Sequence, residues 1–257
     1  MRRAVAVAVA LIAVAPAAAA PPGSVRHGEQ LYGQYCVMCH GAGGSGILRP
    51  RTIGGGPGRG QDEQQGFGPP LRGVGALAAD FYLRTGYMPL QHVRLQPRRS
   101  RVLFSDREIR SLTAYVASLG AGPAIPRPQP GRGKLGRGMH LFMDRCAGCH
   151  QIVAEGGYLT GAVAPPLEDA TTTQIAEAVR IGPYVMPRFS TKAISDADLN
   201  SIIAYVQYAK NPDDRGGWSL GHLGPVPEGL VTWFLAAVAL IGVCIVIGKR
   251  LKGEEAA

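Results

Sequence analysis

Two long apolar stretches interrupt a chain whose other segments mix hydrophobic and polar residues. The first follows the basic start Met1-Arg2-Arg3 and runs through alanine and valine to Ala15, before Pro16 and the small residues that end at Ala20. A basic start, a short apolar middle and a small-residue end are typical of a secretory signal, so residues 1–20 are predicted to be a signal peptide. The alternative is an uncleaved N-terminal anchor. The proline interrupts the apolar run and favours cleavage near Ala20.

The second apolar stretch, residues 230–248, predicts a transmembrane helix. Its sequence LVTWFLAAVALIGVCIVIG carries no charge. At about 1.5 Å per residue it would extend roughly 28 Å, enough to cross the hydrocarbon core of a bilayer. The alternative, a buried core helix, would usually carry a polar face, and this stretch has none. Lys249, Arg250 and Lys252 follow it, which predicts a cytoplasmic tail at 249–257 and places residues 21–228 outside.

Amphipathic helical segments elsewhere in the chain come in pairs. The segment containing Ala114-Tyr115-Val116 and the segment containing Ala204-Tyr205-Val206 each begin with a serine followed three residues later by an acid, a capping box that starts a helix. Four further pairs follow the same order: Gly28–Tyr32 with Gly138–Phe142, Cys36–His40 with Cys146–His150, Pro69–Leu71 with Pro165–Leu167, and Met88-Pro89 with Met186-Pro187. Because all the pairs lie in register, they predict a duplicated domain.

The predicted organisation is mostly α-helical, with little sheet. The segments are a first domain at 24–120, a linker at 121–133, a second domain at 134–211, a linker at 212–229, the membrane helix at 230–248 and the tail at 249–257. Both linkers are rich in proline and glycine, which do not continue a helix. The first domain also contains a glycine-rich insertion at 41–68, predicted to be a surface loop.

Composition and charge limit the possible partners. The formal net charge is +9, which suits an anionic membrane surface, an acidic protein or nucleic acid. The basic residues do not form a dense run with interleaved aromatics, so no nucleic-acid partner is predicted.

The two C-x-x-C-H motifs predict covalent attachment of two haem groups. Two cysteines one helical turn apart can form thioethers with the two vinyl groups of one porphyrin, and the next histidine binds the iron. The predicted residues are Cys36, Cys39 and His40 for one haem, and Cys146, Cys149 and His150 for the other. A zinc site, a dithiol redox pair and a disulfide are the alternatives, but none of them accounts for a histidine after both pairs.

The second axial ligand of each iron is predicted to be a methionine. Met88 and Met186 each precede a proline and occupy matched places in the repeat. A thioether ligand raises the haem potential, which suits an electron carrier. The alternative for both methionines is core packing, and His92 and His140 are rival ligands.

Residues around the histidines complete the predicted sites. Pro69 and Pro165 are expected to offer a backbone carbonyl to the ring N–H of the nearby histidine, which would fix its tautomer and orientation. Leu71 and Leu167 are expected to pack on the haem faces. No acid–base pair, phosphate loop or other substrate site is recognisable in the sequence, so the chain alone is predicted to be a carrier without its own catalytic residues.

Five segments carry a resemblance to a known family: YCVMCH (35–40), TGYMP (85–89), GPYVMPRFS (182–190), IIAYV (202–206) and GWSLGHLGPVPEGL (217–230). With these segments the chain resembles the dihaem cytochrome c subunit (cytochrome cc) of the actinobacterial menaquinol–cytochrome c reductase, the cytochrome bcc complex. The resemblance covers nearly the whole chain. The last segment is the most discriminating, because many dihaem cytochromes share the haem motifs and lack it.

The resemblance implies fold, partners and direction of electron flow. It implies two tandem class I cytochrome c domains with His/Met ligation, hence Met88 and Met186 as iron ligands. It also implies a respiratory complex with a cytochrome b subunit, in which electrons pass from a Rieske iron–sulfur protein through both haems to the copper centre of an aa3-type oxidase. The glycine-rich insertion at 41–68 is longer than the family leads us to expect.

Two other functions remain as alternatives. A dihaem subunit of another membrane oxidase or dehydrogenase is one, although in a haem–copper oxidase subunit the anchor would be expected before the haem domains. A dihaem peroxidase is the other, but it would need one haem open to peroxide. Methionine-proline pairs in both repeats are evidence against it.

Overall fold

The computed structural model describes residues 23–47, 68–90, 98–212 and 225–255. The expected signal peptide, most of the glycine-rich insertion and His92 lie outside these ranges. The described part is mostly helical, which confirms the predicted class, and its only strands form one two-stranded sheet. Its elements are α1 (Val25–Tyr35), α2 (Val37–His40), η1 (Ala42–Gly44), α3 (Gly75–Arg84), α4 (Asp106–Ser118), η3 (Pro130–Arg132), α5 (Leu135–Arg145), α6 (Ala147–His150), β1 (Gly157–Leu159), β2 (Ala162–Ala164), α7 (Thr172–Ile181), α8 (Asp196–Lys210) and α9 (Pro225–Glu255).

Contacts divide the chain into two compact units that do not follow the sequence repeat. One unit comprises Met1–Gln129, Tyr158–Pro165 and Ala170–Asp196, and the other comprises Pro130–Gly157, Pro166–Asp169 and Ala197–Ala257. The first unit therefore contains α7, a helix from the second copy of the repeat, which contacts α3 from the first copy. The domain limits drawn from the sequence stay a prediction.

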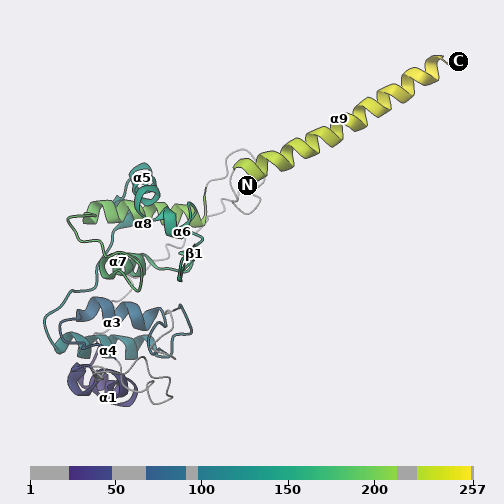
Figure 1. Ribbon diagram of the computed structural model, residues 1–257. Helices are drawn as coiled ribbons and strands as arrows, with labels where there is room; N and C mark the ends of the chain where they lie inside the picture. Colours follow the sequence, from purple (N-terminus) through teal and green to yellow (C-terminus); the bar gives the residue numbers. More distant parts are fainter. Residues whose placement is uncertain (1–22, 48–67, 91–97, 213–224, 256–257) are drawn as a thin grey trace, which may run out of the picture. The chain divides into compact units, whose positions relative to one another are not determined.

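The first unit is built on the close crossing of α1 and α4 (Figure 1). Gly28 makes the crossing possible, because a Cβ atom at this position would lie 2.0 Å from the backbone oxygen of Ser111 in α4. The neighbouring apolar side chains then form one buried cluster. Its buried members are Leu31, Tyr32, Leu83, Phe104, Ile109, Leu112 and Tyr115.

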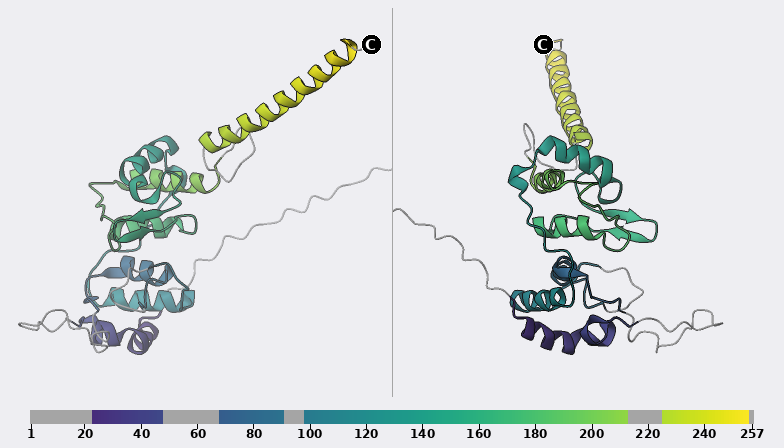
Figure 2. Two further views of the ribbon diagram at one scale, coloured as in Figure 1. Left: turned by 45° about the vertical axis from the view of Figure 1, so that its right-hand side comes forward. Right: turned by 90° about the vertical axis from the view of Figure 1, so that its left-hand side faces the viewer.

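The second unit contains the same crossing between α5 and α8, seen in Figure 2. A Cβ atom at Gly138 would lie 1.9 Å from the backbone oxygen of Ser201. Phe142 of α5 and Tyr205 of α8 pack with their ring centroids 5.3 Å apart, as Tyr32 and Tyr115 do at 5.1 Å in the first unit. The duplicated sequence thus gives two helix pairs, each with a glycine where the two helices cross.

A serine hydroxyl joins each pair near its start. The backbone N–H of Ser24 donates to Oγ of Ser111 at 3.2 Å, and the N–H of Lys134 donates to Oγ of Ser201 at 3.1 Å. The first helix of each pair is therefore anchored to the last helix by a hydrogen bond as well as by packing.

Local sequence explains where the last helices begin. The hydroxyl of Ser105 accepts from the N–H of Glu108, and the Glu108 carboxylate accepts from the N–H of Ser105, which confirms the predicted capping box of α4. The same carboxylate accepts from the Ser105 hydroxyl, and these bonds lower the pKa of Glu108. Helix α8 begins at Asp196, directly after the predicted cap Ser195.

Helix α9 contains the apolar stretch expected to cross the membrane. Residues Gly229–Arg250, 22 residues with a mean hydropathy of 2.8, are long and apolar enough to span a bilayer, and none of the stretch is buried within the described part of the chain. The large apolar side chains from Leu230 to Ile247 are exposed, Trp233 at 77%. The helix fits a single membrane anchor, because such a surface would be unfavourable in water.

Candidate haem attachment sites

The first C-x-x-C-H motif is folded into one tight turn. Cys36 ends α1 and begins α2, and its backbone oxygen accepts hydrogen bonds from the N–H of Cys39 at 3.2 Å and of His40 at 2.9 Å. The two thiols are therefore one turn apart on the same short helix, and neither forms a disulfide. This backbone also holds the histidine directly beside the second thiol.

The surroundings of the motif favour sulfur in a neutral form. Burial, followed by the proximity of Cys39, raises the pKa of the Cys36 thiol to about 11. Burial and the proximity of Cys149 raise the pKa of Cys146 to about 11 in the same way, although Arg145 opposes this. A thioether sulfur is uncharged, so a buried site of low polarity suits it. The donor set fits covalent haem.

His40 is held by a backbone carbonyl. Its Nδ1 lies 2.8 Å from the backbone oxygen of Pro69, the pair that the sequence analysis places together. With Nδ1 protonated and donating to this oxygen, Nε2 keeps its lone pair for a metal. Gly68 allows this approach, because a Cβ atom there would lie 2.5 Å from the backbone oxygen of Cys39 and 2.8 Å from Nδ1 of His40.

The other predicted residues of the first site gather on the same apolar cluster. Cys36, Leu71 and Met88 are half-buried and pack against the core formed by α1 and α4. The backbone N–H of Leu71 donates to Gly44 at 2.9 Å, and the N–H of Met88 donates to Tyr82 at 3.1 Å. The structure thus brings together the motif, the Pro-Leu element and the Met-Pro element of the first repeat.

The second motif repeats the backbone of the first. The backbone oxygen of Cys146 accepts from Cys149 at 3.1 Å and from His150 at 2.9 Å, and His150 is buried at 8% exposure. Gln151 follows with φ 62° and ψ 166°, close to the φ 71° and ψ 166° of Gly41 in the first repeat. Residues other than glycine rarely adopt this backbone conformation, so the second repeat keeps the turn after its histidine at some cost in backbone strain.

The Pro-Leu element of the second repeat forms a backbone hydrogen bond that matches one in the first. The backbone N–H of Leu167 donates to Ala154 at 2.9 Å, as the N–H of Leu71 does to Gly44. Pro165 and Met186 belong to the first unit, and the backbone N–H of the half-buried Met186 donates to Pro183 at 3.0 Å. In the first repeat, the predicted site residues therefore lie together. In the second repeat, His150 and Leu167 belong to one unit, and Pro165 and Met186 belong to the other.

His140, the rival ligand of the second haem, contacts an acidic side chain on its own helix. Its ring Nδ1 lies 3.2 Å from the Asp144 carboxylate one turn along α5, and both side chains are more than half exposed. This is an exposed side-chain contact on the surface of a helix. His92 lies outside the described residues.

The sequence analysis missed a buried polar cluster in the first unit. Asp80 of α3 and Glu177 of α7 are 4% and 0% exposed, and Arg84 lies beside Asp80. Thr171-x-x-Gln174 forms a capping box at the start of α7, and Glu177 follows in the next turn. An acid on the apolar side of a capped amphipathic helix was the signal available in the sequence.

Paired C-x-x-C-H turns on paired helical scaffolds define a c-type cytochrome with two haems. The family model described as "Cytochrome C oxidase, cbb3-type, subunit III" matches residues 23–116 and again 133–206. The cytochrome bc1 complex cytochrome c subunit of Mycobacterium tuberculosis is 37% identical over 235 residues, which cover 88% of this chain and 78% of that protein.

The corresponding subunit of Corynebacterium diphtheriae is 33% identical over 244 residues, covering 88% of this chain and 81% of that protein. Reduced cytochrome c4 of Pseudomonas stutzeri is 21% identical over 72% of this chain and 98% of that one, with a TM-score of 0.24. The chain belongs to the family of the cytochrome bc1 complex cytochrome c subunits. It is an electron-transferring cytochrome c with two covalently bound haem c groups.

Proposed function

We propose that this chain is the membrane-anchored dihaem cytochrome c subunit of a menaquinol–cytochrome c reductase. In this role it would work beside cytochrome b and Rieske subunits, carrying electrons from the Rieske iron–sulfur protein through both haems to the copper centre of an aa3-type oxidase. The observation that carries the proposal is the combination of two C-x-x-C-H turns and a C-terminal apolar helix in one chain of this family.

The proposed ligands of the two irons are His40 with Met88 and His150 with Met186. When bound, haem c supplies a one-electron redox centre. The chain contributes the thiols that hold it and the backbone carbonyl of Pro69 that orients His40. It also contributes apolar walls from Leu71 and the α1–α4 cluster, which exclude water and so favour a high potential.

Tethering explains why two haems would share one chain. If both haems are attached to one polypeptide, transfer between them is intramolecular, and its rate depends on chain geometry instead of diffusion. The anchor keeps both near the membrane partners. Lys249, Arg250 and Lys252 follow the apolar stretch, which supports a cytoplasmic C-terminus and haem domains on the outer face.

The matched family model is described as a subunit of a cbb3-type oxidase, so a role as an oxidase subunit is the second candidate function. The apolar helix here follows the haem motifs. In a haem–copper oxidase subunit we expect the anchor before the haem domains. The placement supports the reductase role.

The test uses the respiratory complex purified with this chain in it. Cys36→Ala and Cys146→Ala each remove one attachment thiol, and Cys244→Ala in the anchor is the control. If both haems lie on the route, menaquinol-driven oxygen uptake falls at least tenfold in each of the first two variants and is unchanged in the control. Oxygen uptake from a small artificial donor to the oxidase should persist in all three.

Two results would contradict the proposal. One is menaquinol-driven oxygen uptake that continues at the wild-type rate after loss of either haem. The other is a complex containing this chain that oxidises no quinol yet reduces oxygen from other donors, which would favour an oxidase subunit. Subunit composition, measured on the same preparations, separates loss of transfer from loss of assembly.

A further inference from the structure

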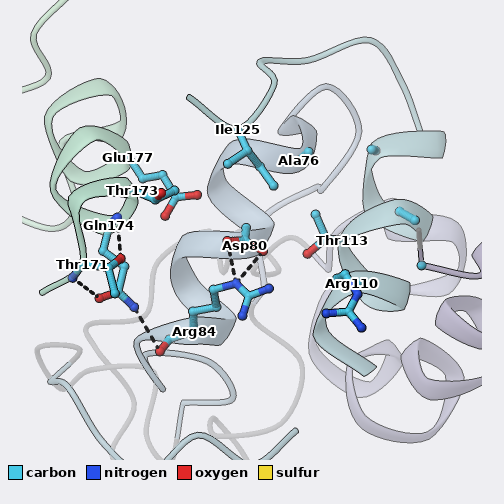
Figure 3. A pocket seen from close by; sticks show the side chains of 13 residues that line it. Ala76, Asp80, Arg84, Arg110, Thr113, Ile125, Thr171, Thr173, Gln174 and Glu177 are labelled. Carbon is cyan, nitrogen blue, oxygen red and sulfur yellow. Dashed lines mark hydrogen bonds and ion pairs between the residues drawn. The ribbon is translucent and has the colours of Figure 1, made fainter. Parts of the chain in front are cut away.

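A cavity of about 600 Å³ lies in the first unit, between α3, α4 and α7 (Figure 3). Alanines and Ile125 form part of its wall, and polar side chains form the rest. Besides Thr171 and Thr173, the polar lining comprises Asp80, Arg84, Arg110, Thr113, Gln174 and Glu177. None of these residues belongs to the haem sites described above, and none was identified from the sequence.

Glu177 is the unusual member of the lining. The residue is 0% exposed, and neither carboxylate oxygen has a hydrogen-bond partner within the described residues. Asp80, by contrast, accepts at both oxygens from Nε of Arg84, at 2.9 and 2.8 Å. A buried carboxylate without a donor or a counter-ion is strongly unfavourable, so Glu177 needs another source of stabilisation.

The nearby cations already have other partners. Arg84 of α3 contacts Asp80 and also Asp106 of α4, at 2.6 Å. Arg110 of α4 pairs with the same Asp106. Arg99, from the segment before α4, donates to Oε1 of Gln174 at 3.1 Å. Among the described residues, each of these arginines therefore has a partner, although Nε of Arg110 is buried without one. The Glu177 carboxyl lies within the influence of the negative charge of Asp80.

The repeat shows that the helix pair does not require an acid here. Arg84 and Arg180 occupy matched places, because each binds the aspartate that begins the following helix, Asp106 or Asp196, at 2.6 Å. Counting back the same distance from each arginine aligns Glu177 with Phe81, which is 4% exposed. An apolar side chain fills the position in one copy, so the carboxyl in the other copy calls for a separate explanation.

We propose that Asp80 and Glu177 are a proton-binding pair, in which Glu177 carries a proton at neutral pH and donates it as a hydrogen bond toward the Asp80 carboxylate across the α3–α7 contact. The Glu177 carboxyl has no donor of its own, and a proton on it makes it the donor toward Asp80. Consistent with this arrangement, burial in the first place and the negative charge of Asp80 in the second raise the pKa of Glu177 to about 8.

The proton would make the contact between α3 and α7 dependent on pH. Glu177 has a pKa raised above the ordinary 4.5, so the folded state binds the proton more tightly than the unfolded state. The stabilisation is full below pH about 4.5 and is lost as the pH rises through about 8, where the carboxyl ionises and releases its proton to solvent. Because α3 and α7 come from different copies of the repeat, the pair couples the two copies to ambient pH.

The test is infrared spectroscopy of the full dihaem chain, with and without ¹³C-labelled glutamate. The wild-type chain is expected to show the C=O band of a protonated glutamate at pH about 6.5, and to lose it by pH about 9.5 with a midpoint near 8. Glu177→Gln keeps the shape, can donate to Asp80 and should lack the band. Glu168→Gln changes an exposed acid on the connection before α7 and should keep the band.

Thermal unfolding provides the second measurement. Between the same pH values, the melting temperature of the wild-type chain and of Glu168→Gln should fall more than that of Glu177→Gln. If Glu177→Gln does not accumulate, the labelled wild-type titration alone decides the question. A glutamate ionised at pH about 6.5, whether bare or held by a cation, would overturn the proposal. So would a band that persists unchanged in Glu177→Gln.

Discussion

Replacing Gly28 with alanine tests the helix crossing on which the first haem site is built. The added Cβ atom would lie 2.0 Å from the Ser111 oxygen and 2.6 Å from its carbonyl carbon. Both atoms belong to the backbone of α4, so no rotamer change can relieve the overlap. Gly33 is in the same helix, and a Cβ atom there meets nothing within 4 Å.

The expected cost follows from these distances. Real Cβ contacts stay above 3.0 Å, so α1 and α4 must separate by about 1 Å at the crossing. Such overpacking costs about 3 kcal/mol, and the better helix propensity of alanine returns about 1 kcal/mol. Gly28→Ala should therefore lose about 2 kcal/mol of unfolding free energy, whereas Gly33→Ala should gain up to about 1 kcal/mol.

The assay is guanidinium unfolding of the full dihaem chain in detergent, followed by circular dichroism. Gly138→Ala and Gly136→Ala form the matched pair in the second repeat, because a Cβ atom at Gly138 would lie 1.9 Å from the Ser201 oxygen and one at Gly136 meets nothing. Equal midpoints for Gly28→Ala and Gly33→Ala would refute the crossing described above.

Two further predictions concern the haem turns. Cys36→Ala should lower the haem content from two groups per chain to one in pyridine haemochrome analysis, because a single remaining thiol no longer secures the first haem. Cys244→Ala should retain two haems. Two haems in Cys36→Ala would count against the assignment. Tyr205→Phe removes the 2.8 Å hydrogen bond from the Tyr205 hydroxyl to the backbone oxygen of Ile152, beside the second motif. It should cost about 1 kcal/mol in chemical unfolding, whereas Tyr158→Phe, at a side chain 91% exposed, should cost nothing measurable.

Much of the fold could be predicted because the duplicated sequence shows each feature twice. The pairing of Gly28–Tyr32 with Gly138–Phe142 helped to predict a duplicated domain, and both segments form helices with matching glycine crossings. The Ser105 capping box could be read because its signal is local, a serine and an acid three residues apart. The apolar anchor is visible for the same reason, since length and composition alone define it.

The packing of α7 on α3 could not be predicted from the repeat. A duplicated pattern indicates which segments pack together within each copy, whereas this contact joins helices from different copies. The buried acids there, Asp80 and Glu177, have no acidic counterparts in the other copy. The strained turn at Gln151 was also hidden, because a glutamine gives no sign of the positive φ that Gly41 announces in the first repeat. The spacing of motifs in a sequence does not indicate which distant residues become buried together, or which residues adopt an unusual backbone conformation.

The most direct test of the central claim, two histidine–methionine haems in one carrier, is magnetic circular dichroism of the ferric full chain alongside haemochrome stoichiometry. We expect two haems per chain, each with the sulfur-to-iron charge-transfer band of methionine ligation. Met88→Leu should remove half of that intensity, and Met139→Leu, at an exposed position on α5, should leave it intact. A high-spin or bis-histidine signal from either haem of the wild-type chain would contradict the account.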